Sequence, residues 1–146
     1  MTNILIVTGN FYQEVSDELM RGARAELQRV GASFEEITVA GAFEIPTAIR
    51  LALDSGKFDA KKFDGFVALG CVIRGETSHY DFVCGESARG IMDLNLQHKA
   101  CIGYGILTVE TMEQAMVRAR VSEGNKGRDA VEACLQLVKL KEKYGK

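Results

Sequence analysis

The chain has 146 residues, of which 47% are apolar and 26% charged, and its formal net charge is −2. This composition excludes an intrinsically disordered chain, and the length predicts a single globular domain over 1–146. The chain has no block of basic residues that would indicate a nucleic-acid groove, and no apolar run near the roughly 20 residues of a membrane span.

Strand-like and helix-like segments alternate along the first part of the chain. Ile4–Val7 is a continuous apolar run, typical of a strand buried on both faces. A helix follows, which Gly31 ends and whose apolar residues recur at helical spacing: Val15, Leu19, Met20, Ala23, Leu27 and Val30. A second strand is predicted over 34–39. Pro46 fits the first turn of a second helix, which we expect to end at Gly56.

The polar turn 74–81 is the most informative segment of the second part. It follows the apolar run Phe66–Ile73, which predicts a third strand, and it precedes a helix that we expect to end near Leu96. Three residues are predicted along the buried face of this helix: Cys84, Ala88 and Ile91. A fourth strand is predicted over 101–107.

Two helices complete the chain. Thr111 and Gln114 have the spacing of a capping box, and the segment 124–127 (GNKG) predicts a turn. The last helix has one apolar side, formed by Val131, Cys134, Leu135 and Val138. The order β-α-β-α-β-α-β-α-α predicts an α/β fold: a four-stranded parallel sheet with helices on both faces, in three layers. Because so small a sheet leaves edge strands open, we expect an oligomer that covers them.

Polar and aromatic residues follow three of the predicted strands. Phe11 and Tyr12 come after the first strand, Phe43 and Glu44 after the second, and Thr77, Ser78 and His79 after the third. The carboxyl ends of parallel strands meet at one edge of a sheet, where ligands of open α/β folds bind. Aromatic rings, hydroxyls, a helix N-terminus and a histidine suit a flat polar ring together with a phosphate or other anion.

Other kinds of site are not indicated. The four cysteines form no C-x-x-C pair and have no histidine at zinc-ligand spacing, so we expect buried free thiols and no metal site: Cys71, Cys84, Cys101 and Cys134. No serine stands in a nucleophile elbow, and Gly103-Tyr104-Gly105 lacks the third glycine of a dinucleotide fingerprint.

Four blocks of the sequence resemble one enzyme family. They are GAFEIP at 41–46, LGCVIRGETSHYDFVC at 69–84, GILTVETMEQAMVRA at 105–119 and GNKG at 124–127. In this order they resemble the 6,7-dimethyl-8-ribityllumazine synthase family over nearly the whole chain. The resemblance implies a flavodoxin-like fold and the penultimate step of riboflavin biosynthesis. In that step 5-amino-6-(D-ribitylamino)uracil condenses with 3,4-dihydroxy-2-butanone 4-phosphate, phosphate is released, and no cofactor takes part.

The resemblance also implies roles for individual residues. His79 matches the residue that transfers protons. The residues that match contacts to the pyrimidine and the ribityl chain are Phe11, Ala42, Phe43, Glu44, Cys71, Val72, Ile73 and Tyr104. The residues that match contacts to the phosphate are Glu76, Thr77 and Arg118, with Lys126 as a further candidate. The family often has threonine in place of Cys71, asparagine in place of Tyr12 and phenylalanine in place of Tyr104.

Family members are homo-oligomers, as pentamers, decamers or sixty-subunit shells. The resemblance therefore implies pentamers or an assembly of pentamers, in which Tyr104 completes the pocket of a neighbouring subunit. The expected partners are small-molecule substrates, with no nucleic acid and no membrane. The chain begins with a strand-like run in place of a signal peptide, so we expect a cytoplasmic location.

Plainer roles remain open for several of these residues. Phe11 could pack in the core or within its loop, Glu44 could complement a helix dipole, and Thr77 could be an N-cap. His79 could be structural, and Arg118 and Lys126 could be solvated surface charges. Two other functions also remain open. One is a flavin-carrying module on the same scaffold, and the other is a shell subunit without catalysis, which Glu76 would favour because a carboxylate repels phosphate.

Overall fold

The sheet contains the four predicted strands. The structure is a computed structural model that describes residues 1–55 and 62–145. The strands are β1 (Asn3–Gly9), β2 (Ser33–Val39), β3 (Gly65–Ile73) and β4 (Ile102–Val109). They pair in the order β2-β1-β3-β4, and every pair is parallel. The prediction of a four-stranded parallel sheet is confirmed.

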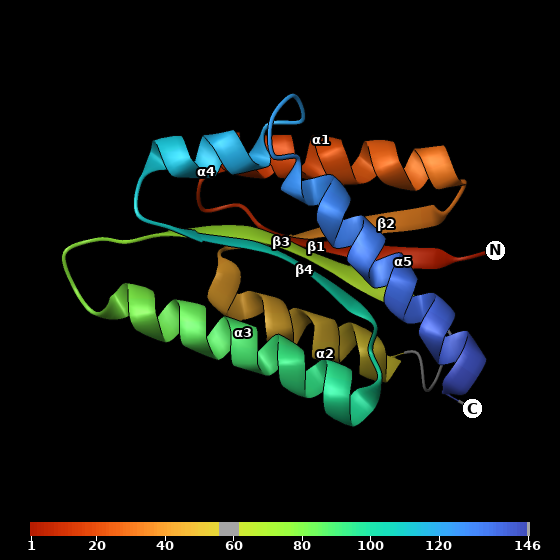
Figure 1. The fold of residues 1–146 in the computed structure, drawn as a ribbon. Coiled ribbons are helices and arrows are strands. Elements are labelled where there is room, and N and C mark those ends of the chain that lie inside the picture. Colours follow the sequence, from red (N-terminus) through yellow and green to blue (C-terminus); the bar gives the residue numbers. More distant parts are fainter. Residues whose placement is uncertain (56–61, 146) are drawn as a thin grey trace.

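Helices cover both faces of this sheet. They are α1 (Gln13–Val30), α2 (Ile45–Ser55), α3 (His79–His98), α4 (Met112–Ala119) and α5 (Lys126–Tyr144), with a short 3-10 turn, Ala42–Glu44, before α2. Figure 1 shows α1, α4 and α5 on one face and α2 and α3 on the other. The three layers and the strand order match the flavodoxin-like sandwich that was expected. The predicted end of α2 at Gly56 lies outside the described residues.

Two cores, one on each face of the sheet, explain the apolar pattern of β1. Ile4 and Ile6 pack in the core under α1 and α5, whereas Leu5 and Val7 pack in the core under α2 and α3. A strand buried on both faces requires a continuous apolar run. The α1 stripe is buried as predicted, except that Val30 is 42% exposed. Val30 is the last residue of α1, where the chain turns away at Gly31 in the left-handed conformation.

The buried face of α3 differs from the predicted one. Ala88 is exposed and Cys84 is only partly buried. The residues that α3 buries are Val83, Ser87, Ile91 and Leu94. The stripe is hard to see in the sequence because it contains a serine, whose hydroxyl is satisfied by donating to the carbonyl oxygen of Cys84 at 3.2 Å.

The start of α4 and the start of β4 refine two other predictions. Thr111 Oγ1 accepts a hydrogen bond from the N–H of Gln114 at 3.1 Å, as in a capping box. In a capping box the side chain at the third helical position also accepts from the N–H of the N-cap residue. Here Gln114 Oε1 accepts instead from the N–H of Glu110, one residue before the N-cap, at 2.8 Å. β4 begins at Ile102 because Cys101 has a positive φ of 63°.

The GNKG segment, 124–127, starts α5 and brings it into contact with α1, whereas the sequence predicted only a turn. Lys126 and Gly127 belong to the first turn of α5, and Asn125 before them is left-handed, with φ 50°. A Cβ on Gly127 would collide with the carbonyl oxygen of Leu19 in α1 and lie 3.0 Å from the N–H nitrogen of Ala23. Glycine at this position therefore lets α5 cross α1 at backbone contact.

Replacement of Gly127 by alanine tests this contact. We expect Gly127→Ala to lower the free energy of unfolding by about 1–3 kcal/mol, the usual cost of overpacking a tight core. Gly85→Ala is the matched control, because a Cβ on Gly85 in α3 would meet no atom within 4 Å. It should leave stability unchanged or raise it by roughly 0.5–1 kcal/mol. Urea denaturation at a fixed protein concentration measures both, and equal midpoints would contradict the assignment.

Candidate active site

Three loops form a cleft at the carboxyl edge of the sheet. They follow β1, β2 and β3, and they enclose a volume of about 530 Å³. This size is typical of a small-molecule site. The predicted site residues that line the cleft are Phe11, Ala42, Phe43, Glu44, Cys71, Val72, Ile73, Thr77 and His79. The topology thus brings together residues from three separate loops, as the strand-end argument predicted.

β3 extends beyond β1 at this edge. The pairing of β1 with β3 ends at Thr8 and Leu69, whereas the pairing of β3 with β4 continues to Ile73 and Val109. From Gly70 onward, β3 therefore has a strand neighbour on one side only among the described residues.

The open side of β3 presents the peptide groups of Cys71 and Ile73. The N–H groups of Phe66 and Arg74 donate toward β4, to the carbonyl oxygens of Cys101 and Val109, both at 3.0 Å. Successive residues of a strand direct their peptide groups to alternate sides, so residues 71 and 73 face the side that β1 has left. A ligand in the cleft can hydrogen bond to this edge as an added strand would.

Two exposed aromatic side chains stand in the loops beside this edge. Phe11 is 74% exposed and Phe43 is 54% exposed. The alternative that Phe11 packs in the core is therefore wrong. Its ring meets that of Tyr12 edge-on, with the centroids 5.0 Å apart. Exposed rings beside an open strand edge suit a flat heterocycle, which gains area from the rings and hydrogen bonds from the strand.

The thiol and phenol groups in the wall of the cleft are neutral near pH 7. Burial raises the pKa of the Cys71 thiol to about 12, with a smaller contribution from Cys84. Burial also raises the pKa of the phenols of Tyr12 and Tyr80. Of the described lining residues, the exposed His79 has the side chain suited to proton transfer at neutral pH.

The loop between β3 and α3 carries the polar end of the cleft. His79 is the first residue of α3, and its N–H donates to Thr77 Oγ1 at 3.3 Å. Ser78, directly before α3, has a helical backbone and makes no side-chain capping bond, so the capping bond is the one that Thr77 Oγ1 accepts, in keeping with the alternative that Thr77 is an N-cap. The positive end of the α3 dipole and the Thr77 hydroxyl therefore lie at the same end of the cleft, an arrangement that favours an anion.

Four predicted residues do not line the cleft of their own chain. Glu76 is exposed in the β3–α3 loop, outside the lining. Tyr104 lies on the edge strand β4, is 40% exposed, and hydrogen bonds with Ser87. Arg118, in the last turn of α4, donates to the carbonyl oxygen of Gln114 at 3.1 Å. 

Lys126 is the fourth of these residues. It starts α5 and lies 3.5 Å from the carboxylate of Asp129. Its side chain is about half exposed, as expected for a surface ion pair. Because Glu76, Tyr104 and Arg118 are exposed as well, all four side chains are accessible to a second chain.

Two tyrosines line the cleft without having been predicted as contacts. Tyr12 follows Phe11, and Tyr80 follows His79. The sequence analysis placed Tyr12 at this edge, after the first strand, without assigning it a contact, and it placed Tyr80 only within the polar turn 74–81. The ring of Tyr80 stacks under the guanidinium of Arg74, whose central carbon lies 4.2 Å from the ring centroid.

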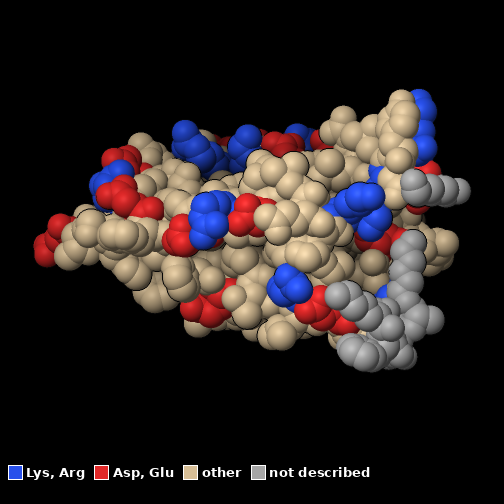
Figure 2. Space-filling view, turned by 90° about the horizontal axis from the view of Figure 1, so that it is seen from below, with Lys and Arg blue, Asp and Glu red and all other residues tan. Residues whose placement is uncertain are grey.

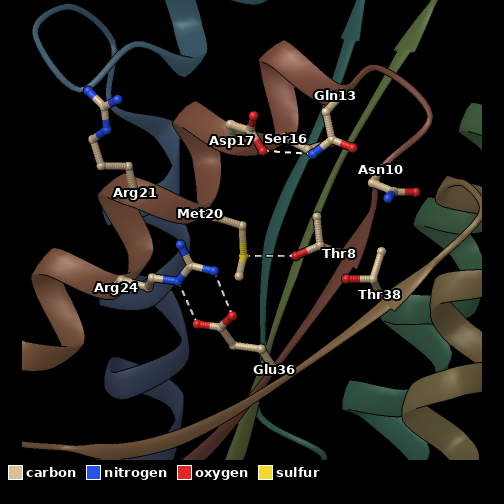
Figure 3. Close-up of a pocket in the computed structure, with 10 residues that line it drawn as sticks. All are labelled: Thr8, Asn10, Gln13, Ser16, Asp17, Met20, Arg21, Arg24, Glu36 and Thr38. Carbon is tan, nitrogen blue, oxygen red and sulfur yellow. Dashed lines mark hydrogen bonds and ion pairs between the residues drawn. The ribbon is translucent and has the colours of Figure 1, made fainter.

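A second pocket lies between α1 and the strands β1 and β2. It encloses about 340 Å³ and includes none of the predicted site residues. Figure 3 shows Arg24 and Glu36 pointing toward each other across it, and Arg24 Nη2 donates to Glu36 Oε1 at 2.7 Å. The Thr8 hydroxyl donates to the sulfur of Met20 at 2.9 Å. Two arginines, Arg21 and Arg24, and two carboxylates, Asp17 and Glu36, line this pocket, so it has no excess of positive charge for an anion.

Within residues 1–55 and 62–145, no group of three or more histidine, cysteine, aspartate or glutamate side chains is arranged to hold a metal ion. In the same residues, no helix has both the length and the apolarity that a bilayer crossing requires.

The sequence matches known proteins along almost all of its length. A family model described as 6,7-dimethyl-8-ribityllumazine synthase matches residues 1–142. The protein of that name from Methylorubrum populi is 54% identical over 140 residues, which cover 96% of this chain and 83% of that protein. The one from Azorhizobium caulinodans is 55% identical over 138 residues, 94% of this chain and 85% of that protein.

A more distant relative covers still more of the chain. The protein named 6,7-dimethyl-8-ribityllumazine synthase 1 from Rhizobium meliloti is 49% identical over 143 residues, 98% of this chain and 94% of that protein. These matches span the four sequence blocks and the three loops of the cleft. The chain therefore belongs to the 6,7-dimethyl-8-ribityllumazine synthase family.

Proposed function

We propose that the cleft at the carboxyl edge of the sheet is the active site in which this chain carries out the reaction of its family. In that reaction 5-amino-6-(D-ribitylamino)uracil and 3,4-dihydroxy-2-butanone 4-phosphate condense to 6,7-dimethyl-8-ribityllumazine, with release of phosphate. The observation that supports the site is the meeting, in one cleft, of an open strand edge, two exposed aromatic rings and His79.

The uracil ring fits the half of the cleft that is built on the sheet. Its alternating donors and acceptors suit the peptide groups of Cys71 and Ile73, and its faces suit Phe11 and Phe43. The ribityl chain then extends toward Ala42 and Glu44, where a carboxylate can accept hydrogen bonds from hydroxyls. Recognition through the main chain explains how a cysteine serves where the family often has threonine.

The phosphorylated substrate fits the half of the cleft that is built on the β3–α3 loop. There the Thr77 hydroxyl and the N–H groups at the start of α3 offer donors to the phosphate. Imine formation, phosphate elimination and ring closure each move a proton, and we assign this exchange to His79, which starts α3 and lines the cleft. Such acid–base help contributes about 10²–10⁴-fold to a rate, and holding two substrates in contact contributes further.

The cleft of a single chain has no cation for the phosphate. Among the described lining residues none is lysine or arginine, whereas Arg118 and Lys126 are exposed elsewhere on the surface. We therefore propose a homo-oligomer, a pentamer or an assembly of pentamers, in which Arg118, Lys126 and Tyr104 of one subunit complete the cleft of its neighbour. A cyclic arrangement of this kind makes the same heterologous contact at every interface.

The surface supports association. Figure 2, which views the face covered by α2 and α3, shows wide uncharged areas between the acidic and basic side chains. Large apolar side chains are exposed on these two helices: Leu51, Phe82, Met92 and Leu96. Apolar surface of this extent indicates contact with another protein surface. The interspersed charges do not indicate a nucleic-acid or membrane partner, and we propose small-molecule substrates and a cytoplasmic location.

The reaction itself is the first test. Purified protein mixed with both substrates should develop lumazine fluorescence faster than the substrates alone, after the spontaneous reaction is subtracted. A flavin-carrying module would instead purify yellow and show only the background rate. A shell subunit without catalysis would show the background rate and no colour. Sedimentation of the same sample measures the assembly.

Replacement of His79 tests its part in proton transfer. We expect His79→Ala to lower kcat by about 10²-fold, the usual loss on removal of a general acid–base group. The side chain is exposed, so the thermal midpoint of the variant should stay close to that of the parent protein. An unchanged kcat would remove the catalytic role.

Mixed oligomers test whether Arg118 serves a neighbouring cleft. Arg118→Ala should raise KM for the phosphorylated substrate by about 10-fold or more, through loss of a charge-assisted hydrogen bond, and should leave KM for the pyrimidine nearly unchanged. We then mix equal amounts of His79→Ala and Arg118→Ala subunits, unfold them together and let them reassemble. The mixture should recover about one quarter of parental activity, because about that share of the cyclic interfaces pairs an intact His79 with an intact Arg118.

Two outcomes would contradict this arrangement. If both residues acted within one chain, mixing the two variants would recover no activity. Equal losses for the two substrates in the Arg118→Ala variant would show that Arg118 is not a phosphate ligand.

A further inference from the structure

A cation–aromatic contact ties together the two ends of the β3–α3 loop. Arg74 is the first residue after β3, and Tyr80 is the second residue of α3. The guanidinium carbon of Arg74 lies 4.2 Å from the centroid of the Tyr80 ring. The residues between them include Thr77 and His79, which line the cleft. The loop that carries the polar half of the cleft is thus closed at its base.

The guanidinium of Arg74 also joins this loop to the neighbouring strand. Its Nε donates to both carboxylate oxygens of Glu110, at 2.9 and 3.1 Å. Its Nη1 lies 3.5 Å from Oδ1 of Asp81, in the first turn of α3. The backbone N–H of Arg74 donates to the carbonyl oxygen of Val109 at 3.0 Å. One side chain therefore connects the ends of β3 and β4 with the start of α3.

The carboxylate that holds Arg74 is itself fixed. The N–H of Glu110 donates to Gln114 Oε1 at 2.8 Å, and the N–H of Gln114 donates to the N-cap oxygen of Thr111 at 3.1 Å. The start of α4 thus sets the position of Glu110, and through Glu110 the position of Arg74. A guanidinium held on two edges and stacked on a ring has a single orientation.

Arg74 does not line the cleft, although the loop that it closes does. We propose that Arg74 is a positioning residue for the reaction. Together with Glu110 and Tyr80, it fixes the start of α3 so that His79 reaches the substrates, and it does not bind the substrates itself. This inference rests on the function proposed for the cleft.

The exposure of the pair separates this role from a purely structural one. The side chains of Arg74 and Glu110 are 43% and 56% exposed. Exposed ion pairs contribute little to the stability of a folded protein. Loss of the contact should therefore change the geometry of the loop more than the stability of the fold, and a displacement of about 1 Å at a catalytic group can cost as much as 10²-fold in rate.

Substitutions on both sides of the pair test the proposal. We expect Arg74→Gln and Glu110→Gln each to lower kcat by about 10- to 100-fold. The double variant should be no slower than the worse single variant, because each change breaks the same contact. KM for the phosphorylated substrate should change little. In the substrate-free proteins, hydrogen exchange of the 75–79 segment should be faster in all three variants.

Two further measurements show whether Arg74 acts through His79. In the His79→Ala background, Arg74→Gln should lower the residual kcat by less than about 2-fold, because the group that it positions is gone. Arg89→Gln is the matched control: Arg89 pairs with Glu86 at 2.9 and 3.1 Å and with Asp93 at 3.0 Å, and it does not line the cleft. Its kcat should equal that of the parent protein.

Each other result would overturn the proposal. A rise in KM for the phosphorylated substrate with Arg74→Gln, and none with Glu110→Gln, would make Arg74 a phosphate ligand. If the kcat of Arg74→Gln equals that of Arg89→Gln, Arg74 has no positioning role. If Arg74→Gln lowers kcat in the His79→Ala background as much as in the parent protein, its effect is structural. If Arg74→Gln does not fold, Glu110→Gln alone decides by the same criteria. An inactive parent protein would instead reject the proposed function, and loop exchange would still report on the contact.

Discussion

The early end of β1 beside β3 is the constraint on which the site depends. A Cβ on Gly9 would lie 2.7 Å from the carbonyl carbon of Gly41, so β1 ends against the turn that follows β2 at backbone contact. Beyond this point β1 has left the sheet, and β3 continues with β4 alone to Ile73. The loop after β1 places Phe11 beside the vacated edge, and the turn after β2 places Phe43 there. The cleft is thus the space that a longer β1 would have filled.

An open strand edge determines what such a cleft binds. Peptide groups that lose a strand partner need another hydrogen-bond partner, since a buried unpaired group costs as much as a lost hydrogen bond. Water molecules can hydrogen bond to these peptide groups when no ligand is bound. A single planar heterocycle with alternating donors and acceptors can hydrogen bond to several of them at once. Burial raises the pKa of the Cys71 thiol to about 12, so the thiol is neutral near pH 7. In the proposed function the backbone supplies specificity, and the aromatic rings supply apolar contact area.

The sequence predicted those features that local patterns determine. Continuous apolar runs predicted β1 and β3, the segments 34–39 and 101–107 were predicted as the other two strands, and helical spacing predicted the stripe of α1. The buried face of α3 escaped because Ser87 lies in it, and only the fold shows that its hydroxyl is satisfied. The role of Gly127 escaped because a close approach of two helices leaves no local pattern. The resemblance supplied Arg118, Lys126 and Tyr104, which lie outside the cleft of their own chain, and their proposed place in a neighbouring cleft depends on a second copy that no pattern within one chain reveals.

Arg74 differs from Arg118 and Lys126 in how fully its side chain is committed to partners within the chain. Arg74 uses its Nε on Glu110, its Nη1 on Asp81 and one face on Tyr80. A guanidinium has five N–H donors in a fixed plane, so one committed in this way cannot also turn to follow a phosphate that binds and then leaves. Arg118 and Lys126 have exposed side chains on other elements. The proposed roles follow this division, with Arg74 as rigid support within the chain and Arg118 and Lys126 as the positive charge that a neighbouring subunit brings to a site that releases a dianion.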